Sequence, residues 1–165
     1  MGDRSKGTPV THVIFTLTRV EAAHLADLVG QFQALVENSE GESGDPAVDR
    51  LTPDVYPDDA DASREFRRVT RDDLLGRRAH DAAIVAADLA RIESASVNEA
   101  LSPVDVSIAD LEPWLRTLSA VRLVLASRLG IADGAEHDED DPAYGLYEWL
   151  GYRLEGLIQV AENES

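Results

Sequence analysis

The chain has 165 residues, a length that favours a single domain, and its hydrophobic share of 44% with only 5% aromatic residues favours an aliphatic core. The formal net charge of −17 at pH 7 disfavours docking on phosphate backbones and on anionic membranes. The lack of cysteine excludes disulfides, thiolate metal sites and a thiol redox switch.

A short strand is predicted at residues 12–18, because apolar residues alternate along it. Thr18 and Glu21 then match a capping box, in which each side chain accepts a hydrogen bond from the other residue's backbone N–H. The helix that begins there is predicted to run to about residue 38. Its apolar stripe has helical spacing and consists of Leu25, Leu28, Val29, Phe32, Leu35 and Val36.

The middle of the chain predicts turns, then a second extended segment, then a second capped helix. Residues 45–62 are rich in proline and acids, so we expect at most one helical turn, around 46–51. An extended segment at 64–70 and a helix over 72–95 follow. We expect 64–70 to pair with 12–18 as a two-stranded ribbon packed on the helices.

The most apolar helix is predicted at 110–129, with Gly130 as a left-handed C-terminal cap. Because it is apolar on nearly every side, we expect other helices to enclose it. Residues 96–106 form a connector before it, and Pro142 opens a last helix. The predicted fold is mainly α: a single-domain bundle of about four long helices, with room for a short two-stranded β-ribbon.

We place a flexible N-terminus at 1–11 and the single helical domain at 12–163. No segment approaches the ~18 apolar residues of a membrane helix, and residues 1–10 lack the apolar run of a signal peptide. We therefore expect a cytoplasmic protein.

Motifs along the chain resemble a known family. In the second half they are Pro103-Val104-Asp105-Val106, Trp114-Leu115-x-x-Leu118, Val121-Arg122-Leu123-Val124-Leu125-x-x-Arg128-Leu129-Gly130-Ile131 and Tyr147-Glu148-Trp149-Leu150. In the first half they are Arg50-Leu51-x-Pro53-x-Val55-Tyr56 and Glu65-Phe66-Arg67-x-Val69-Thr70. Over about residues 12–160 the chain resembles the actinobacterial family catalogued as domain of unknown function 2017.

The resemblance implies a small, mainly helical cytoplasmic protein. Some family members are labelled transcriptional or oxidative-stress regulators. Where that label invokes a redox switch, it depends on N-terminal cysteines. This chain has no cysteine, so the redox mechanism does not carry over.

Arg122 and Arg128 form the first candidate site, because an arginine in a core helix needs a partner. One interpretation is a site for an anion or for a carboxylate of a partner protein. The alternative is that each arginine pairs with a carboxylate or a helix C-terminus inside the fold, or extends its stem over the core. Asp110, Glu148 and the acidic loop 133–141 offer such carboxylates.

An arginine cluster between residues 64 and 78 is the second candidate. Six arginines against three acids make this segment locally +3. The arginines are Arg64, Arg67, Arg68, Arg71, Arg77 and Arg78. They form either a patch for nucleic acid or an acidic partner, or a set of internal pairs, since Asp73 and Asp81 lie at helix-pair spacing from Arg77.

The acidic loops and the aromatic residues are weaker candidates. Loops 54–61 and 133–141 lack the alternating oxygen ligands and the glycine of a calcium loop, so we predict solvated loops, no metal and no cofactor. Tyr147 and Tyr152 suit the rim of a partner surface. The alternative for the aromatic residues, Trp149 included, is core packing.

The chain lacks the GxSxG, P-loop and HExxH motifs, and we expect no enzymatic activity. Our first hypothesis is a regulatory or adaptor protein that acts through protein–protein contacts, in transcriptional or stress regulation. The second is a DNA-binding regulator that uses the Arg64–Arg78 segment, although the net charge argues against nucleic acid. The third is an enzyme with a site near Arg122 and Arg128, completed by Asp110 and Glu148.

We expect a protein partner and no membrane, and a homo-oligomer stays open. The residues selected as contacts to a partner or an anion are Arg67, Arg68, Arg71, Arg122, Arg128, Tyr147 and Trp149.

Overall fold

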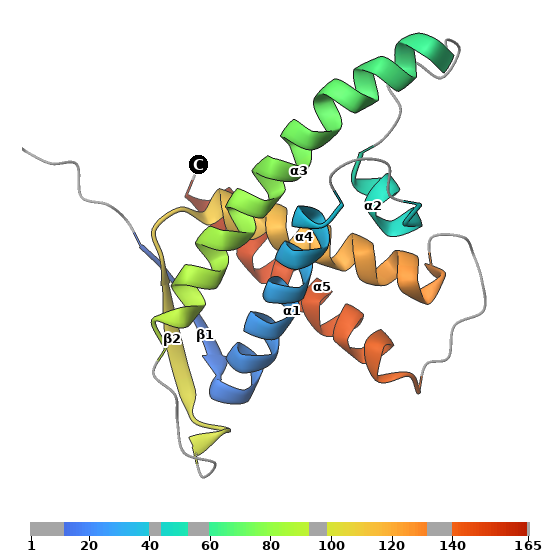
Figure 1. The fold of residues 1–165 in the computed structure, drawn as a ribbon. Coiled ribbons are helices and arrows are strands. Elements are labelled where there is room, and N and C mark those ends of the chain that lie inside the picture. Colours follow the sequence, from blue (N-terminus) through green and yellow to red (C-terminus); the bar gives the residue numbers. More distant parts are fainter. Residues whose placement is uncertain (1–11, 40–43, 53–59, 93–98, 132–139, 165) are drawn as a thin grey trace, which may run out of the picture.

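A computed structural model describes residues 12–39, 44–52, 60–92, 99–131 and 140–164, without the side chains of 60–64, 67 and 68 (Figure 1). The expected flexible segment 1–11 lies outside these residues. The elements in chain order are β1 (Val13–Thr18), α1 (Arg19–Glu37), α2 (Pro46–Leu51), α3 (Ala60–Ala90), β2 (Pro103–Ile108), α4 (Leu111–Leu129) and α5 (Pro142–Asn163). The mainly α fold with four long helices is confirmed, and α2 adds a short fifth helix.

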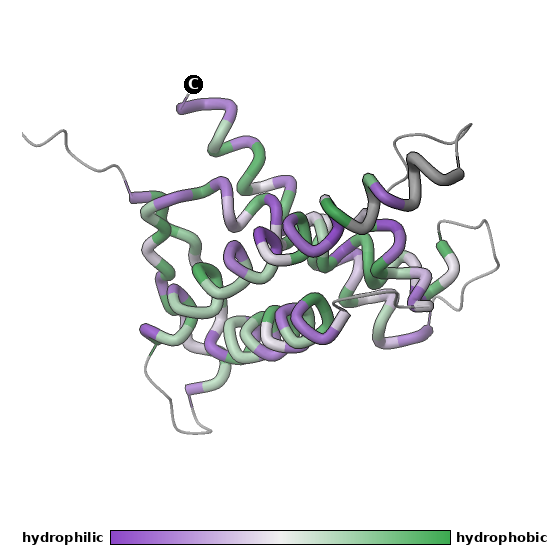
Figure 2. Tube along the Cα trace, turned by 45° about the horizontal axis from the view of Figure 1, so that its top comes forward, coloured by the Kyte–Doolittle hydropathy of each residue, from purple (hydrophilic) through white to green (hydrophobic). Residues whose placement is uncertain are grey.

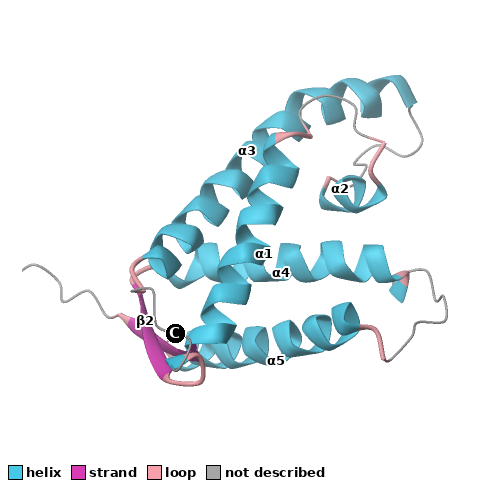
Figure 3. Ribbon diagram, turned by 60° about the horizontal axis from the view of Figure 1, so that its bottom comes forward, coloured by secondary structure: helices cyan, strands magenta, loops and turns pink. Residues whose placement is uncertain are grey.

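Helix α4 is the centre of the arrangement, as predicted. It packs against α3 and α5, and also contacts α2 and α1 (Figure 3). Helix α3 in turn packs along α1. The expectation that α4 is enclosed on nearly every side is only partly met, because Ser119 and Leu123 are exposed on one face.

Local capping signals set the starts and ends of α1 and α4. The Thr18 hydroxyl accepts a hydrogen bond from the Glu21 N–H at 3.2 Å, and the Glu21 carboxylate accepts one from the Thr18 N–H at 2.7 Å. Asp110 caps α4 through the Glu112 N–H at 3.2 Å. Gly130 ends α4 in the left-handed conformation, with φ at 71°.

The ribbon exists, but the prediction of its second strand is wrong. Strand β1 pairs antiparallel with β2, in a register that runs from Val13 opposite Ile108 to Thr18 opposite Pro103. Packing selects this strand, because Val106 and Ile108 are buried on the same face of the ribbon as Phe15 and Val13.

Residues 64–70, which were predicted to be extended, lie inside α3. The helix begins at Ala60 rather than at residue 72 and ends at Ala90 rather than near 95. The Thr70 hydroxyl donates to the Phe66 carbonyl oxygen at 2.7 Å, a bond within the helix and not a cap. Three of the seven residues 64–70 are arginine and one is glutamate, both good helix formers, and the stretch contains no Gly or Pro, so it is compatible with a helix.

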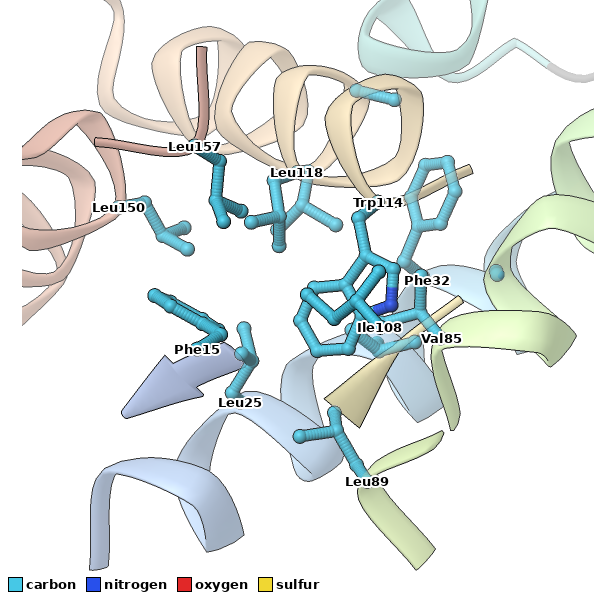
Figure 4. Packing of buried hydrophobic residues seen from close by; sticks show 14 of the residues in the cluster. Phe15, Leu25, Phe32, Val85, Leu89, Ile108, Trp114, Leu118, Leu150 and Leu157 are labelled. Atoms are coloured by element: carbon cyan, nitrogen blue, oxygen red, sulfur yellow. The ribbon is translucent and has the colours of Figure 1, made fainter. Parts of the chain in front are cut away.

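The core gathers side chains from β1, β2 and the four long helices (Figure 4). Trp114 is fully buried, and its ring meets the Phe15 ring edge-on with centroids 5.8 Å apart. Leu25, Leu118 and Leu150 are buried in the same cluster. Hydrophobic and hydrophilic residues are interspersed along the helices (Figure 2), and none of the described helices is long and apolar enough to cross a bilayer.

Candidate functional site

Arg128, a predicted contact residue, forms an ion pair inside the fold. Its Nη1 and Nη2 lie 2.8 and 2.7 Å from the two carboxylate oxygens of Asp45. Asp45 also caps α2, because it accepts a hydrogen bond from the Ala47 N–H at 3.0 Å. The hydrogen bonds from Arg128 lower the pKa of Asp45, and those to Asp45 raise the pKa of Arg128. The pair therefore fastens α2 to the end of α4.

Arg122 and Tyr147, two other selected residues, contact each other. The guanidinium carbon of Arg122 lies 4.0 Å from the centre of the Tyr147 ring, and its Nε donates to the Tyr147 carbonyl oxygen at 3.3 Å. Gly151 on α5 provides the space for the Arg122 guanidinium, because a Cβ at this position would lie 2.8 Å from Arg122 Nη2. The stacking of Arg122 on Tyr147 therefore joins α4 to α5.

Trp149 also turns inward. Its indole N–H donates to a Glu21 carboxylate oxygen at 2.9 Å. Arg153, which was not among the selected residues, reaches the same carboxylate at 3.0 Å. Trp149 thus holds α5 to the start of α1 and is not part of an open partner surface.

The described members of the arginine cluster have different surroundings. Arg71 is buried and pairs with Asp49 at 3.3 Å, and the exposed Arg77 pairs with Asp73 at 3.1 Å. The side chains of Arg64, Arg67 and Arg68 lie outside the described residues. The cluster therefore does not present its described guanidiniums on one face free of acids.

Arg78 differs from its neighbours in the cluster. It lies between Leu75 and Ala82 in the buried stripe of α3, and its side chain is half-buried. Its Nε is enclosed without an acceptor, and no hydrogen bond or ion pair joins it to any described residue. Burial lowers the pKa of Arg78, and the charge of Asp81 opposes this shift without cancelling it.

Asp81 accepts hydrogen bonds from Arg116 and forms none with Arg78. Arg116 Nε lies 2.9 Å from one Asp81 oxygen, and Nη2 lies 3.5 Å from the other. Arg116 also pairs with Glu112 at 2.8 Å. These bonds link α4 to α3 and raise the pKa of Arg116.

The side chain of Arg78 lines a groove of about 940 Å³ between α3, α4 and α5. The aliphatic residues of this groove come one from each helix, namely Leu74, Leu115 and Ile158. Its charged residues are Asp72, Asp73, Arg77, Arg78, Asp81 and Arg116. An open groove with an aliphatic strip between charged residues resembles a protein-binding surface more than an enclosed pocket for a small molecule.

Two of the three arginines in the groove form ion pairs with two of its three aspartates. Arg77 pairs with Asp73 and Arg116 with Asp81. Within the part of the chain that the structure describes, Asp72 and Arg78 are left without an ion pair. Three arginines face three aspartates, so the groove is locally neutral on a chain of charge −17.

A second, smaller groove of about 240 Å³ lies beside β2 and the end of α3. Its Asp88 is engaged by the Trp114 indole N–H at 2.8 Å and by Arg91 at 3.4 Å. Neither groove contains the set that the enzymatic hypothesis requires, which is Arg122, Arg128, Asp110 and Glu148. In residues 12–164, gaps excepted, no three His, Asp or Glu side chains gather as a metal site.

The selection of contact residues from the sequence missed Arg78, although the arginine cluster contained it. One signal was available: Arg78 stands three residues after Leu75 and four before Ala82, on the apolar stripe of its helix. No sequence signal connects Leu74 with Leu115 and Ile158, since they come from three separate helices.

Comparison with known proteins gives one match. A family model described as "Domain of unknown function (DUF2017)" matches residues 3–161. No curated protein and no solved structure matches the chain. The description of the family assigns no activity, so any function has to be argued from the groove itself.

Proposed function

The chain belongs to the family of domain of unknown function 2017, and on this premise we propose that it is a non-catalytic adaptor or regulatory protein. It binds a partner protein through the groove between α3, α4 and α5. The observation that carries the proposal is Arg78, a half-buried cation that lines the groove without a hydrogen-bonded partner among the described residues. Transcriptional or stress regulation in the cytoplasm is the setting we propose for this contact.

The walls of the groove are held in place without a partner. Arg116 bridges α4 to α3 through Asp81, and α5 packs along α4 beside Ile158. A surface that is already formed loses little conformational entropy when it binds. The preformed groove therefore favours a role in binding a partner protein.

Leu154 continues the apolar surface of the groove along α5, because it stands one turn before Ile158 on the same face of the helix. Only Leu150 and Leu157 are buried among the residues of this helix, and Leu154 and Val160 are partly exposed. Tyr152 is 74% exposed, but it stands six positions before Ile158 and therefore on a different face of α5. An open groove that continues into partly exposed apolar residues suits a protein surface better than an enclosed small molecule.

Direct DNA binding by the arginine cluster has less support. It requires several free guanidiniums on one face, whereas Arg71 pairs with Asp49 and Arg77 with Asp73. Phosphate would also meet the field of a chain with a charge of −17.

The proposal is tested by photo-crosslinking in the native host. A benzophenone amino acid replaces Ser119, which lines the groove, or Ala23, an exposed residue of α1 that does not line it. We expect one protein to crosslink at position 119 and not at position 23, and untagged wild-type protein to compete. Absence of a crosslink at 119, or the same products at both positions, contradicts the proposal.

A further inference from the structure

The position of Arg78 indicates what the groove recognises. A cation that is partly removed from water is favourable only with an acceptor, and the Nε of Arg78 has none. Arg71 and Arg153 also have an enclosed Nε, but their terminal nitrogens form ion pairs with Asp49 and Glu21. Arg78 has no such pair among the described residues.

The surroundings of Arg78 restrict the acceptor to an anion attached to an apolar body. Leu74, Leu115 and Ile158 line the same groove, so a ligand that reaches Arg78 also covers aliphatic surface. A carboxylate matches a guanidinium, because it can accept two parallel hydrogen bonds.

The shape of the groove favours a helix over an extended chain. Its lining on α3 runs from Asp72 to Asp81, which corresponds to about 14 Å at the rise of an α-helix. All three of its walls are helices, so an incoming strand would find no strand edge to pair with. A helix that lies between helices places aliphatic residues at i, i+3, i+4 and i+7 in such a groove.

The net charge of the chain does not prevent an acidic helix from docking here. The groove is locally neutral, and exposed charges further away than about 8 Å are largely screened at physiological ionic strength. Asp72, the acid of the groove that forms no ion pair with any described residue, is exposed to water, whereas Arg78 is half-buried with an enclosed Nε, so Arg78 determines the local preference.

We infer that the groove receives an amphipathic helix of the partner protein, in which an Asp or Glu side chain pairs with Arg78 and aliphatic side chains cover Leu74, Leu115 and Ile158. This inference rests on the proposed adaptor function and adds the chemistry of the partner.

The test uses the full chain and stapled helical peptides of about three turns. Each peptide carries leucine at i, i+3, i+4 and i+7, with Glu, Gln or Lys on the same face. Affinities are measured by fluorescence anisotropy for wild type, for Arg78→Met and for the control Arg77→Met. Arg77 suits as a control because it lines the same groove but is 76% exposed and pairs with Asp73.

We expect wild type to bind the Glu peptide about tenfold more tightly than the Gln peptide, and the Lys peptide most weakly. Arg78→Met should bind the Glu and Gln peptides alike, and Arg77→Met should keep the preference. Equal binding of Glu and Gln peptides by wild type, a preference that survives in Arg78→Met, or no binding of any peptide overturns the inference.

Three further outcomes distinguish failure of this inference from failure of the adaptor function. Decanoate that binds in an Arg78-dependent manner, while no peptide binds, would show a small-molecule site and overturn the inference. A partner captured at position 119 without a Glu preference leaves the adaptor function standing and removes the inference. Failure of the crosslink at position 119 removes both.

Discussion

Arg153 on the last helix and Glu21 on the first share one ion pair that joins the two ends of the fold. Arg153 Nη2 lies 3.0 and 3.2 Å from the two carboxylate oxygens of Glu21. The same carboxylate accepts from the Thr18 N–H and from the Trp149 indole N–H. Partial burial of the carboxylate raises its pKa, but the hydrogen bonds from Thr18, Trp149 and Arg153, together with the charge of Arg153, outweigh this effect and lower the pKa to about 2.

The first prediction concerns the stability of the protein towards acid. Because the folded state lowers the pKa of Glu21 from 4.5 to about 2, the ionised carboxylate stabilises the fold above pH 4.5. This contribution is lost as the pH falls from 4.5 towards 2, and at neutral pH it is on the order of 3 kcal/mol.

Urea unfolding of wild type and Glu21→Gln across this range checks the prediction. The difference in the free energy of unfolding should be largest near neutral pH and should shrink below pH 4.5. Glu155→Gln, at an exposed position of α5, is the control. A difference that stays constant with pH would show that the ionisation of Glu21 contributes nothing.

The second prediction separates the two roles of Asp45. Asp45→Asn keeps a good N-cap for α2 but removes the charge that pairs with Arg128, so we expect a loss of about 0.5–1 kcal/mol. Asp45→Ala also removes the cap and should cost roughly 1 kcal/mol more. Chemical denaturation of both variants, alone and with Arg128→Met, gives the coupling energy. The prediction fails if Asp45→Asn and Asp45→Ala are equally stable.

The third prediction concerns Gly151 and the stacked Arg122. Alanine in place of a helical glycine normally stabilises by up to about 1 kcal/mol. At Gly151 the new Cβ would lie 2.8 Å from Arg122 Nη2 and displace the guanidinium from Tyr147, so we expect the gain to be cancelled. Gly145→Ala, where nothing lies within 4 Å of the new Cβ, should keep the full gain.

Thermal unfolding of the two variants checks this difference. In an Arg122→Ala background the obstacle is gone, so Gly151→Ala should stabilise as much as Gly145→Ala does. Equal stabilisation by both substitutions in the wild-type background would refute the stacking argument.

The fourth prediction contrasts two arginines of the groove. Arg78→Met removes a half-buried charge that forms no ion pair with any described residue, and it keeps the stem volume, so we expect an increase in stability of about 1 kcal/mol. Arg116→Met leaves Asp81, which is only 14% exposed, without its partner and should cost about 1 kcal/mol. Denaturant midpoints of both variants, measured under the same conditions, test this prediction. Destabilisation by Arg78→Met would show that Arg78 stabilises the fold and would contradict the prediction.

The local signals in the sequence were sufficient for most helix ends. The box of Thr18 and Glu21 and the left-handed Gly130 were predicted, and the structure confirms them. The start of α4 near residue 110 was also predicted, and the structure shows that Asp110 is its cap. Each of these signals depends on hydrogen bonds between residues at most four positions apart. Local signals could not identify the second strand of the ribbon. Residues 64–70 and 103–108 both contain residues compatible with a strand, and only packing on the core selects 103–108.

The sequence by itself determined the helical class, the central α4 and the family, because periodicity, caps and motifs are properties of neighbouring residues. Only the tertiary structure decided which partner each charged residue has. Arg128 pairs with Asp45, which is 83 positions away, while Arg78 has no ion-pair partner among the described residues and shares a groove with Leu115 and Ile158. Ion pairs and grooves depend on distances in space that arise when helices pack, and spacing along the chain does not contain them.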